Sequence, residues 1–387
     1  MRMPLTPLLI LMAASGLAVP LHPAELGGIA VQGTLQGGYY NDNAGVSVAS
    51  PSADLRVAPD PRTALTLRYD VDAVSAASFD YARSKTHANG LHAAGACNSC
   101  HSSVDALSGA SRNYIEQRQA VTFGAERRIG ESKASVSYYH GDEHDYRSDA
   151  VSLGWSQAMA HRDSTLDLEV HHRSDLVGAS WDPTFQKPRY AIGAALGYTQ
   201  VLTPDSQLKA VLDYEDTQGY LADPYAFVQV WLYDSLPYSA SAPGKRQRWD
   251  LDLAFKQALP WDGAAAEADY RYYADTWDVA AHSVALSLSQ ELAGWVLEPE
   301  ARFYTQTKAS FFQNHYQEVQ GWMTRDLKLA AFQTYLLGLS LRGPLWNALE
   351  AELRYTHFVR VDQLDYSLYF ADGPVAADTV QLGITLR

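Results

Sequence analysis

The chain has 387 residues, a formal net charge of −14 and a composition that is nearly half apolar but only 19% charged. The acidic balance excludes an obvious polyanionic partner, because nucleic-acid binders carry a basic face. The low charged fraction, together with 24 Tyr and 9 Trp, favours strands with interfacial aromatic girdles, and a soluble β-sandwich is the alternative.

The N-terminal residues are typical of a secretory signal. Met1 and Arg2 precede an apolar run from Leu5 to Leu17, which is too short for a membrane-spanning helix of about 20 residues. We therefore expect a signal peptide over residues 1–24, cleaved between residues 18 and 24, and an exported mature chain over 25–387. No later stretch has the length and hydropathy of a transmembrane helix.

Alternation of apolar and polar residues marks the strands of the mature chain. In the segment 249–256, one face carries Asp250, Asp252, Ala254 and Lys256, and the other carries Trp249, Leu251, Leu253 and Phe255. The same alternation runs through 208–215, 266–273 and 349–356. A period of two predicts strands with an apolar face toward lipid and a polar face toward a lumen.

The connections between these segments alternate in length, as they do in outer-membrane barrels. The short ones are 60–63, 128–133, 160–164, 203–206, 260–263, 293–295 and 343–347; the long ones are 76–112, 178–188, 222–245, 313–327 and 362–378. We predict an all-β transmembrane antiparallel barrel of about 16 strands, the first starting at Ile29 and the last ending at Arg387. Its short turns are periplasmic and its long loops extracellular.

A c-type haem motif lies in the loop 76–112. The sequence Cys97-Asn98-Ser99-Cys100-His101 has the spacing that marks covalent haem attachment. Cys97 and Cys100 would form the thioethers, and His101 would be the proximal iron ligand. We therefore expect one covalently bound haem c.

Two questions about this loop stay open. A disulfide between Cys97 and Cys100 is the alternative to haem, although it closes a very small loop and leaves His101 unexplained. The sixth iron ligand is His87 or His92, or the position is open. Bis-histidine ligation predicts an electron carrier, whereas an open position predicts a haem-based sensor or a peroxidase.

Other polar clusters carry weaker signals. The run from His140 to Asp145 is either a metal site or a solvated strand end, and the strand end is the preferred interpretation. His171 and His172 alternate across a strand, so they cannot easily face one metal. Acidic residues on the polar faces either bias a pore toward cations or pair with Arg271 and Arg354; they are Glu169, Asp213, Asp250, Asp252, Glu267, Asp269, Glu350 and Glu352.

The chain also resembles the bacterial outer-membrane barrels grouped as domain of unknown function 3570. The resemblance rests on the segments 69–75, 108–111, 219–225, 270–273 with Trp277 and His282, and 298–304. It implies an outer-membrane barrel and no defined activity. A Ser- and Pro-rich connection usually links the first two of these segments in the family, whereas this chain carries its haem motif there.

These observations predict an electron carrier, not an enzyme. We expect a barrel in the outer membrane of a Gram-negative bacterium, in contact with outer-membrane lipid, that exchanges electrons with periplasmic or extracellular cytochromes. A porin-like channel with no redox role is the alternative, and a haem-based surface sensor or peroxidase is the second alternative.

Overall fold

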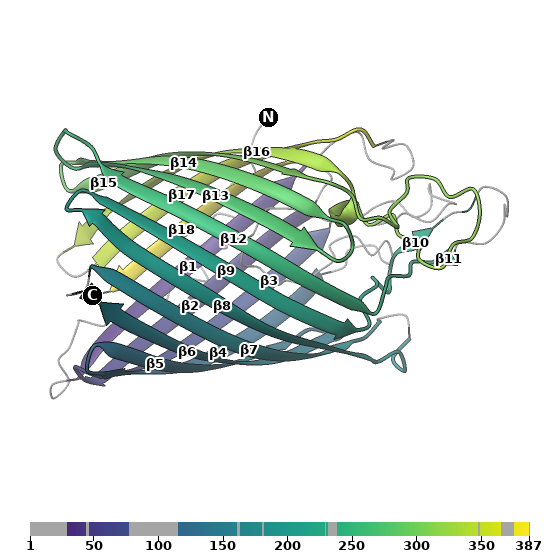
Figure 1. The fold of residues 1–387 in the computed structure, drawn as a ribbon, viewed down its shortest axis with the longest axis horizontal. Helices are drawn as coiled ribbons and strands as arrows, with labels where there is room; N and C mark the ends of the chain where they lie inside the picture. Colours follow the sequence, from purple (N-terminus) through teal and green to yellow (C-terminus); the bar gives the residue numbers. More distant parts are fainter. Residues whose placement is uncertain are drawn as a thin grey trace.

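Sixteen antiparallel strands form a closed barrel in the computed structural model of the protein (Figure 1). The structure describes residues 29–43, 46–76, 115–160, 163–179, 182–228, 230, 238–346, 349–364 and 375–386. The barrel strands are β1 (Ala30–Asp42), β2 (Val46–Asp60), β3 (Thr63–Ala76), β4 (Ile115–Ile129), β5 (Ser132–Asp142), β6 (Tyr146–Met159), β7 (Ser164–Val177), β8 (Lys187–Thr203), β9 (Ser206–Gly219), β12 (Lys245–Ala258), β13 (Ala264–Asp275), β14 (Ala280–Leu292), β15 (Trp295–Gln306), β16 (Phe332–Trp346), β17 (Leu349–Val361) and β18 (Ala376–Leu386). The predicted strand number is confirmed.

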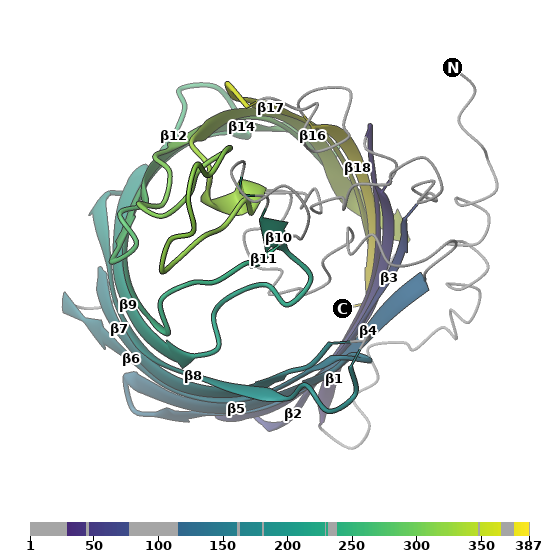
Figure 2. The same cartoon turned by 90° about the vertical axis from the view of Figure 1, so that its right-hand side faces the viewer.

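Pairing of the first strand with the last closes the barrel. β1 pairs with β2 on one side and with β18 on the other, in a register that runs from Gly33 opposite Leu386 to Asp42 opposite Ala377. Closure removes the free strand edges, so backbone N–H and C=O groups have partners around the wall. Viewed along its axis, the wall is a ring of tilted strands around a lumen (Figure 2).

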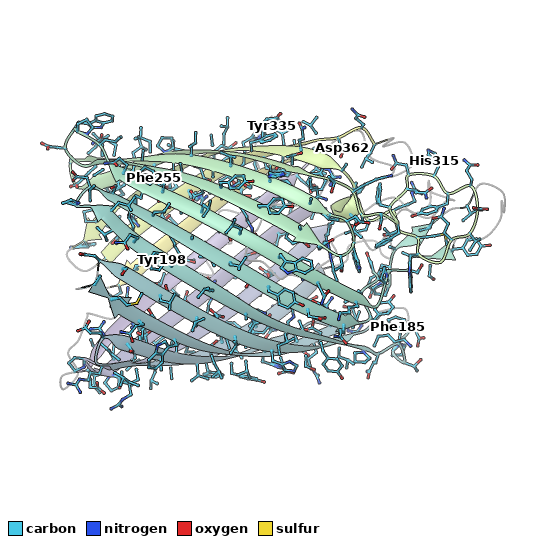
Figure 3. All side chains as sticks on the ribbon, viewed as in Figure 1. Phe185, Tyr198, Phe255, His315, Tyr335 and Asp362 are labelled. Atoms are coloured by element: carbon cyan, nitrogen blue, oxygen red, sulfur yellow. The ribbon has the colours of Figure 1, made fainter. Side chains whose placement is uncertain are left out.

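The outward face of the wall is apolar. Leu337 is 63% exposed and Ile192 is 61% exposed, and Phe255, Tyr198 and Tyr335 also lie on the outside (Figure 3). Of the segment 249–256, Trp249, Leu253 and Phe255 are exposed as predicted, whereas Asp250 is buried on the inner face. Apolar side chains at such positions are stable when lipid surrounds them. Within the described ranges, no helix is long and apolar enough to cross a membrane.

Strand connections differ between the two ends of the barrel. The end at which β1 begins and β18 ends carries the predicted short periplasmic turns; Gly130 (φ 62°) and Gly263 (φ 70°) take left-handed conformations in two of them. The extracellular end carries the long loops, and also three short connections at 43–45, 143–145 and 276–279. The connection at 43–45 explains why no long loop is visible in the sequence between the first two strands.

Two extracellular loops, 220–244 and 307–331, pack together into a unit that we call the outer cap. It contains the short strands β10 (Phe227–Val228) and β11 (Tyr238–Ser239) and the 3-10 helix η2 (Leu327–Leu329). Bridges join the two loops at Val230 and Tyr316 and at Ser241 and Met323. The cap projects beyond the wall at the extracellular end (Figure 1) and lies within the outline of the ring in the view along the axis (Figure 2).

Small apolar cores stabilise the outer cap. One consists of Ala226, Val228, Val230, Ala240, Tyr316 and Met323. The other joins the cap to the wall through the 276–279 turn and consists of Trp277, Val279, Ala309, Phe311, Phe312, Leu329 and Ala330. Burial of these side chains removes apolar area from water and holds the loops over the barrel end.

Candidate functional site in the barrel lumen

The residues predicted to bind haem lie outside the described part of the chain. These are Cys97, Cys100 and His101, with His87 and His92 as candidate sixth ligands. The structure does describe the strands from which their loop departs: β3 and β4 pair as far as Ser75 opposite Ile115, at the extracellular end. The two ends of the haem-motif loop are therefore held side by side at that end of the wall.

The described residues bring a different set of functional groups together inside the barrel. Three carboxylates, four arginines, two tyrosines and one histidine lie on the inner faces of neighbouring strands from β6 to β13, and we call this set the luminal charge belt. Its members are Tyr146, His171, Arg173, Asp175, Arg189, Glu215, Arg246, Arg248, Tyr273 and Asp275. Each carboxylate is the centre of one cluster.

Asp175 on β7 is the centre of the first cluster. Its side chain is fully buried and accepts a hydrogen bond from Arg189 Nε at 2.7 Å, while Arg173 Nε lies 3.4 Å away. Arg189 also donates to the Tyr146 hydroxyl, and its guanidinium lies over the Tyr146 ring at 5.2 Å. Two guanidiniums compensate the desolvation of one carboxylate, as a buried charge requires.

Glu215 on β9 is the centre of the second cluster. Its Oε1 accepts hydrogen bonds from Arg248 Nη1 at 2.6 Å and Thr217 Oγ1 at 2.8 Å, and lies 3.6 Å from Arg173 Nη2. Its Oε2 lies 3.4 Å from His171 Nε2. His171 faces the lumen whereas His172 is exposed on the other face, so the two histidines do not share a site.

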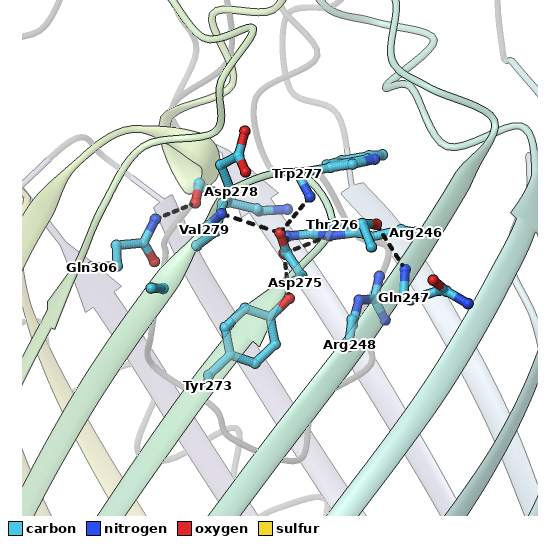
Figure 4. Close-up of polar contacts among 12 residues, drawn as sticks. Arg246, Gln247, Arg248, Tyr273, Asp275, Thr276, Trp277, Asp278, Val279 and Gln306 are labelled. Atoms are coloured by element: carbon cyan, nitrogen blue, oxygen red, sulfur yellow. Dashed lines mark hydrogen bonds and ion pairs between the residues drawn. The ribbon is translucent and has the colours of Figure 1, made fainter.

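Asp275, the last residue of β13, joins the wall to the cap (Figure 4). Its Oδ2 accepts from Arg246 Nε at 2.8 Å and from the Tyr273 hydroxyl at 2.6 Å. Its Oδ1 accepts from the backbone N–H groups of Trp277 at 2.8 Å and Val279 at 3.1 Å. One buried carboxylate therefore fixes both an arginine of the wall and the turn that carries two core residues of the cap.

Trp277 completes this junction. Its indole N–H donates to the Lys245 carbonyl at 3.0 Å, and the Arg246 guanidinium lies 4.3 Å from its ring centroid. The Trp277 ring also packs edge-on against Phe311 of the cap at 5.1 Å. A cation–π contact with the wall and an aromatic contact with the cap therefore meet at this one ring and orient the cap relative to the wall.

An acidic band lies next to the belt on the periplasmic side. Asp213 on β9 stands opposite Asp250 on β12, and Asp252 follows Asp250 by two residues on the same face. Arg271 forms an ion pair with Asp250 and lies 3.6 Å from Asp252. Pairing with Arg271 was one of the two alternatives that the sequence left open for these acidic residues. Arg354 pairs at 2.5 Å with Glu300, which was not among the predicted acidic residues.

The His140–Asp145 run lies at the end of β5, in agreement with the preferred interpretation, but it is not solvated throughout, because Glu143 is buried. His140 Nδ1 lies 2.9 Å from Asp149 Oδ1, to which Tyr138 also donates at 2.6 Å. Tyr355, His357 and Asp378 repeat this arrangement with the same two distances on β17 and β18. Among the residues that the structure describes, no cluster of three or more His, Cys, Asp and Glu side chains could hold a metal ion.

The arginines of the belt were not predicted from the sequence, in which the acidic residues of the polar faces stand out more clearly. A usable signal was present: Arg173 and Asp175, and Arg246 and Arg248, are pairs of charged residues two positions apart in alternating segments. Such pairs share one face of a strand. Which carboxylate each arginine binds depends on strand register, which the sequence does not show.

Comparison with known proteins agrees with the fold. The profile of a family described as "Protein of unknown function (DUF3570)" matches residues 9–367. No curated protein matches the chain.

Solved structures with a similar fold are outer-membrane barrels. A bacterial polysaccharide outer membrane secretin is 10% identical, with a TM-score of 0.50 over 92% of this chain and 98% of that one. CdiB from Acinetobacter baumannii is 9% identical, with a TM-score of 0.50 over 91% of this chain and 60% of CdiB. At these identities the similarity shows the fold alone.

Proposed function

The chain belongs to the DUF3570 family, and we propose that this member carries one covalently bound haem c and transfers electrons between partner cytochromes and the cell surface. The observation that carries the proposal is the pentapeptide from Cys97 to His101. It combines two thiols and an imidazole at the spacing of c-type haem attachment.

The position of the insertion supports this role. The motif-bearing segment lies between β3 and β4, whose paired ends are at the extracellular end of the wall. Its two ends therefore start at the cell-surface side of an outer-membrane barrel. A redox group tethered there would be attached to a rigid scaffold at the boundary between the membrane and the exterior.

The chain's own residues define what the bound group could do. A haem held by Cys97 and Cys100 with His101 as proximal ligand supplies a reversible one-electron couple. His87 or His92 as sixth ligand would make it a carrier, whereas an open position would suit a sensor or a peroxidase. The apolar band of such a barrel is about 25 Å tall, so one centre requires a partner cytochrome.

Electron exchange tests the proposal directly. The barrel is purified from a host that matures c-type cytochromes, reduced with dithionite, desalted, and mixed in a stopped-flow instrument with an oxidised soluble c-type cytochrome. We expect the reduced cytochrome to appear at a rate that rises with barrel concentration. The Cys97→Ala/Cys100→Ala variant provides the baseline, and a wild-type rate equal to that baseline would refute electron transfer.

A channel is the second candidate function, and the charged lumen favours it. The inner face carries ion pairs on at least β6 to β13, whereas the outer face is apolar, as in barrels with a polar interior. Ion conductance in a planar lipid bilayer measures this function. Equal conductance of wild type and the Cys97→Ala/Cys100→Ala variant would show that a channel exists independently of haem.

A further inference from the structure

Arg248 holds an unusual position in the luminal charge belt. It donates a single hydrogen bond within the described part of the chain, to Glu215, and its side chain is 32% exposed. A guanidinium has five N–H donors in a planar fork. In Figure 4, Arg248 lies beside the Asp275 cluster with no bond to it. Most of its hydrogen-bonding capacity is therefore unused.

Two other arginines of the belt are engaged by hydrogen bonds, whereas the Nε of Arg173 has no hydrogen-bond partner among the described residues. Arg246 binds Asp275 through two nitrogens, and Arg189 binds Asp175. Arg173 lies between Asp175 and Glu215, at 3.4 and 3.6 Å. Within the belt, four arginines thus share three carboxylates, so the belt alone has one more positive than negative charge, and the acidic band is a separate set toward the periplasm. Because Arg248 and Arg173 share a single oxygen of Glu215, the surplus is centred there.

We propose that Arg248 and the adjoining Arg173 form an anion-binding site in the lumen, for a small solute that carries a carboxylate or phosphate group. Guanidiniums bind these groups with paired, charge-assisted hydrogen bonds. Partial exclusion of water by the wall strengthens the attraction relative to an exposed surface. Glu215 holds Arg248 in place through Nη1 alone and leaves the other N–H groups of Arg248 for the solute.

The acidic band limits this site to the extracellular part of the lumen. Asp213 precedes Glu215 by two residues on β9, and Asp250 follows Arg248 by two residues on β12, so both carboxylates lie one step toward the periplasm. They repel an anion that moves further inward. The site uses no residue of the haem-motif loop, so either proposal can be refuted without affecting the other.

Calorimetric titration of the purified full-length barrel with inorganic phosphate, at constant ionic strength, tests the site. We expect wild type to bind phosphate and Arg248→Gln to raise its Kd about tenfold or more, the effect of losing a charge-assisted hydrogen bond. Arg248→Lys should fall between them, because it keeps the charge without the fork. Glu215 retains Arg173, His171 and Thr217 in either variant, so we expect both to fold.

Lys256→Gln is the matched control. Lys256 lies on the same face of β12 as Arg248 but is 56% exposed and pairs with Glu267 at 3.5 Å. We expect its removal to leave the phosphate Kd unchanged. No binding to wild type, an unchanged Kd in Arg248→Gln, or an equal loss in Lys256→Gln would each overturn the proposal. Haem content, measured on the same samples, should be the same in all variants.

Discussion

The wall and the outer cap place their apolar residues in opposite environments. On the wall, Leu337 and Ile192 are among the most exposed large apolar side chains that the structure describes; in the cap, Val228 and Tyr316 are fully buried. The wall inverts the usual arrangement because lipid is its outer solvent and ion pairs line its inner face. The cap lies beyond the strands and follows the rule for proteins in water. One chain therefore folds against two solvents, and Asp275 lies where they meet.

We expect the largest effect at this junction. Asp275→Asn removes the charge partner of Arg246, and both side chains are mostly buried, at 0% and 15% exposure. Breaking a buried pair of this kind costs about 3–5 kcal/mol. Urea unfolding of the refolded barrel in detergent should show that loss. Asp278→Asn is the control. Asp278 lies in the same turn, is exposed and has φ 67°, a conformation that Asn tolerates. The Asp278→Asn protein should therefore be as stable as wild type.

The second-largest effect distinguishes the outer face of the wall from its inner face. Leu35 and Gln36 are adjacent in the middle of β1; Leu35 is exposed on the apolar outer face and Gln36 alternates to the inner face. Leu35→Lys places a charge in lipid, which destabilises a barrel by about 2–4 kcal/mol near the bilayer midplane. Gln36→Lys should destabilise the barrel much less, because its charge lies on the inner face. Unfolding of both variants from liposomes measures the difference, and equal losses would contradict the assignment of the faces.

A smaller effect tests the core of the cap. The Tyr316 hydroxyl contacts the Phe311 carbonyl at 2.5 Å and accepts from the Thr324 N–H at 2.8 Å. Tyr316→Phe leaves these buried groups without that partner, which costs about 1–3 kcal/mol. Hydrogen exchange should speed up in 220–244 and 307–331 but not in the wall. Tyr335→Phe, on the exposed outer face, should change neither region.

The smallest effect is a pH dependence of the cap. Burial raises the pKa of Tyr220 to about 12, from its ordinary value of 10, and burial also raises the pKa of Tyr316. Because the folded cap holds these phenols neutral, their contribution to the stability of the cap is complete below pH 10. This stabilisation is lost as the pH rises toward 12. Near-UV circular dichroism should therefore change in this range before far-UV circular dichroism does. Tyr220→Phe should move the change to higher pH, and an unmoved transition would argue against this cause.

The wall could be predicted from sequence because its rules are local. A period of two identifies a strand and its two faces, and loop lengths identify its two ends, so the segment 249–256 and the turn at 260–263 were recognisable without coordinates. The number of strands followed from counting these segments.

The cap and the ion pairs could not be predicted in the same way. Val230 and Tyr316 meet across a long stretch of chain with no periodicity between them. The partner of Arg354 depends on register, and a shift of one residue would exchange the faces. The haem assignment rests on sequence chemistry alone, because the segment from Cys97 to His101 lies outside the described residues.

The central claim is that this segment binds haem covalently, and a haem stain after denaturing electrophoresis of the outer-membrane fraction tests it most directly. The wild-type protein and the Cys97→Ala/Cys100→Ala variant are compared in a host that matures other c-type cytochromes, because only covalent haem survives denaturation. We predict a stained band at the mass of the mature wild-type chain and none for the variant. An unstained wild-type band, alongside stained host cytochromes, would contradict the claim and leave an outer-membrane channel with a small disulfide-closed loop.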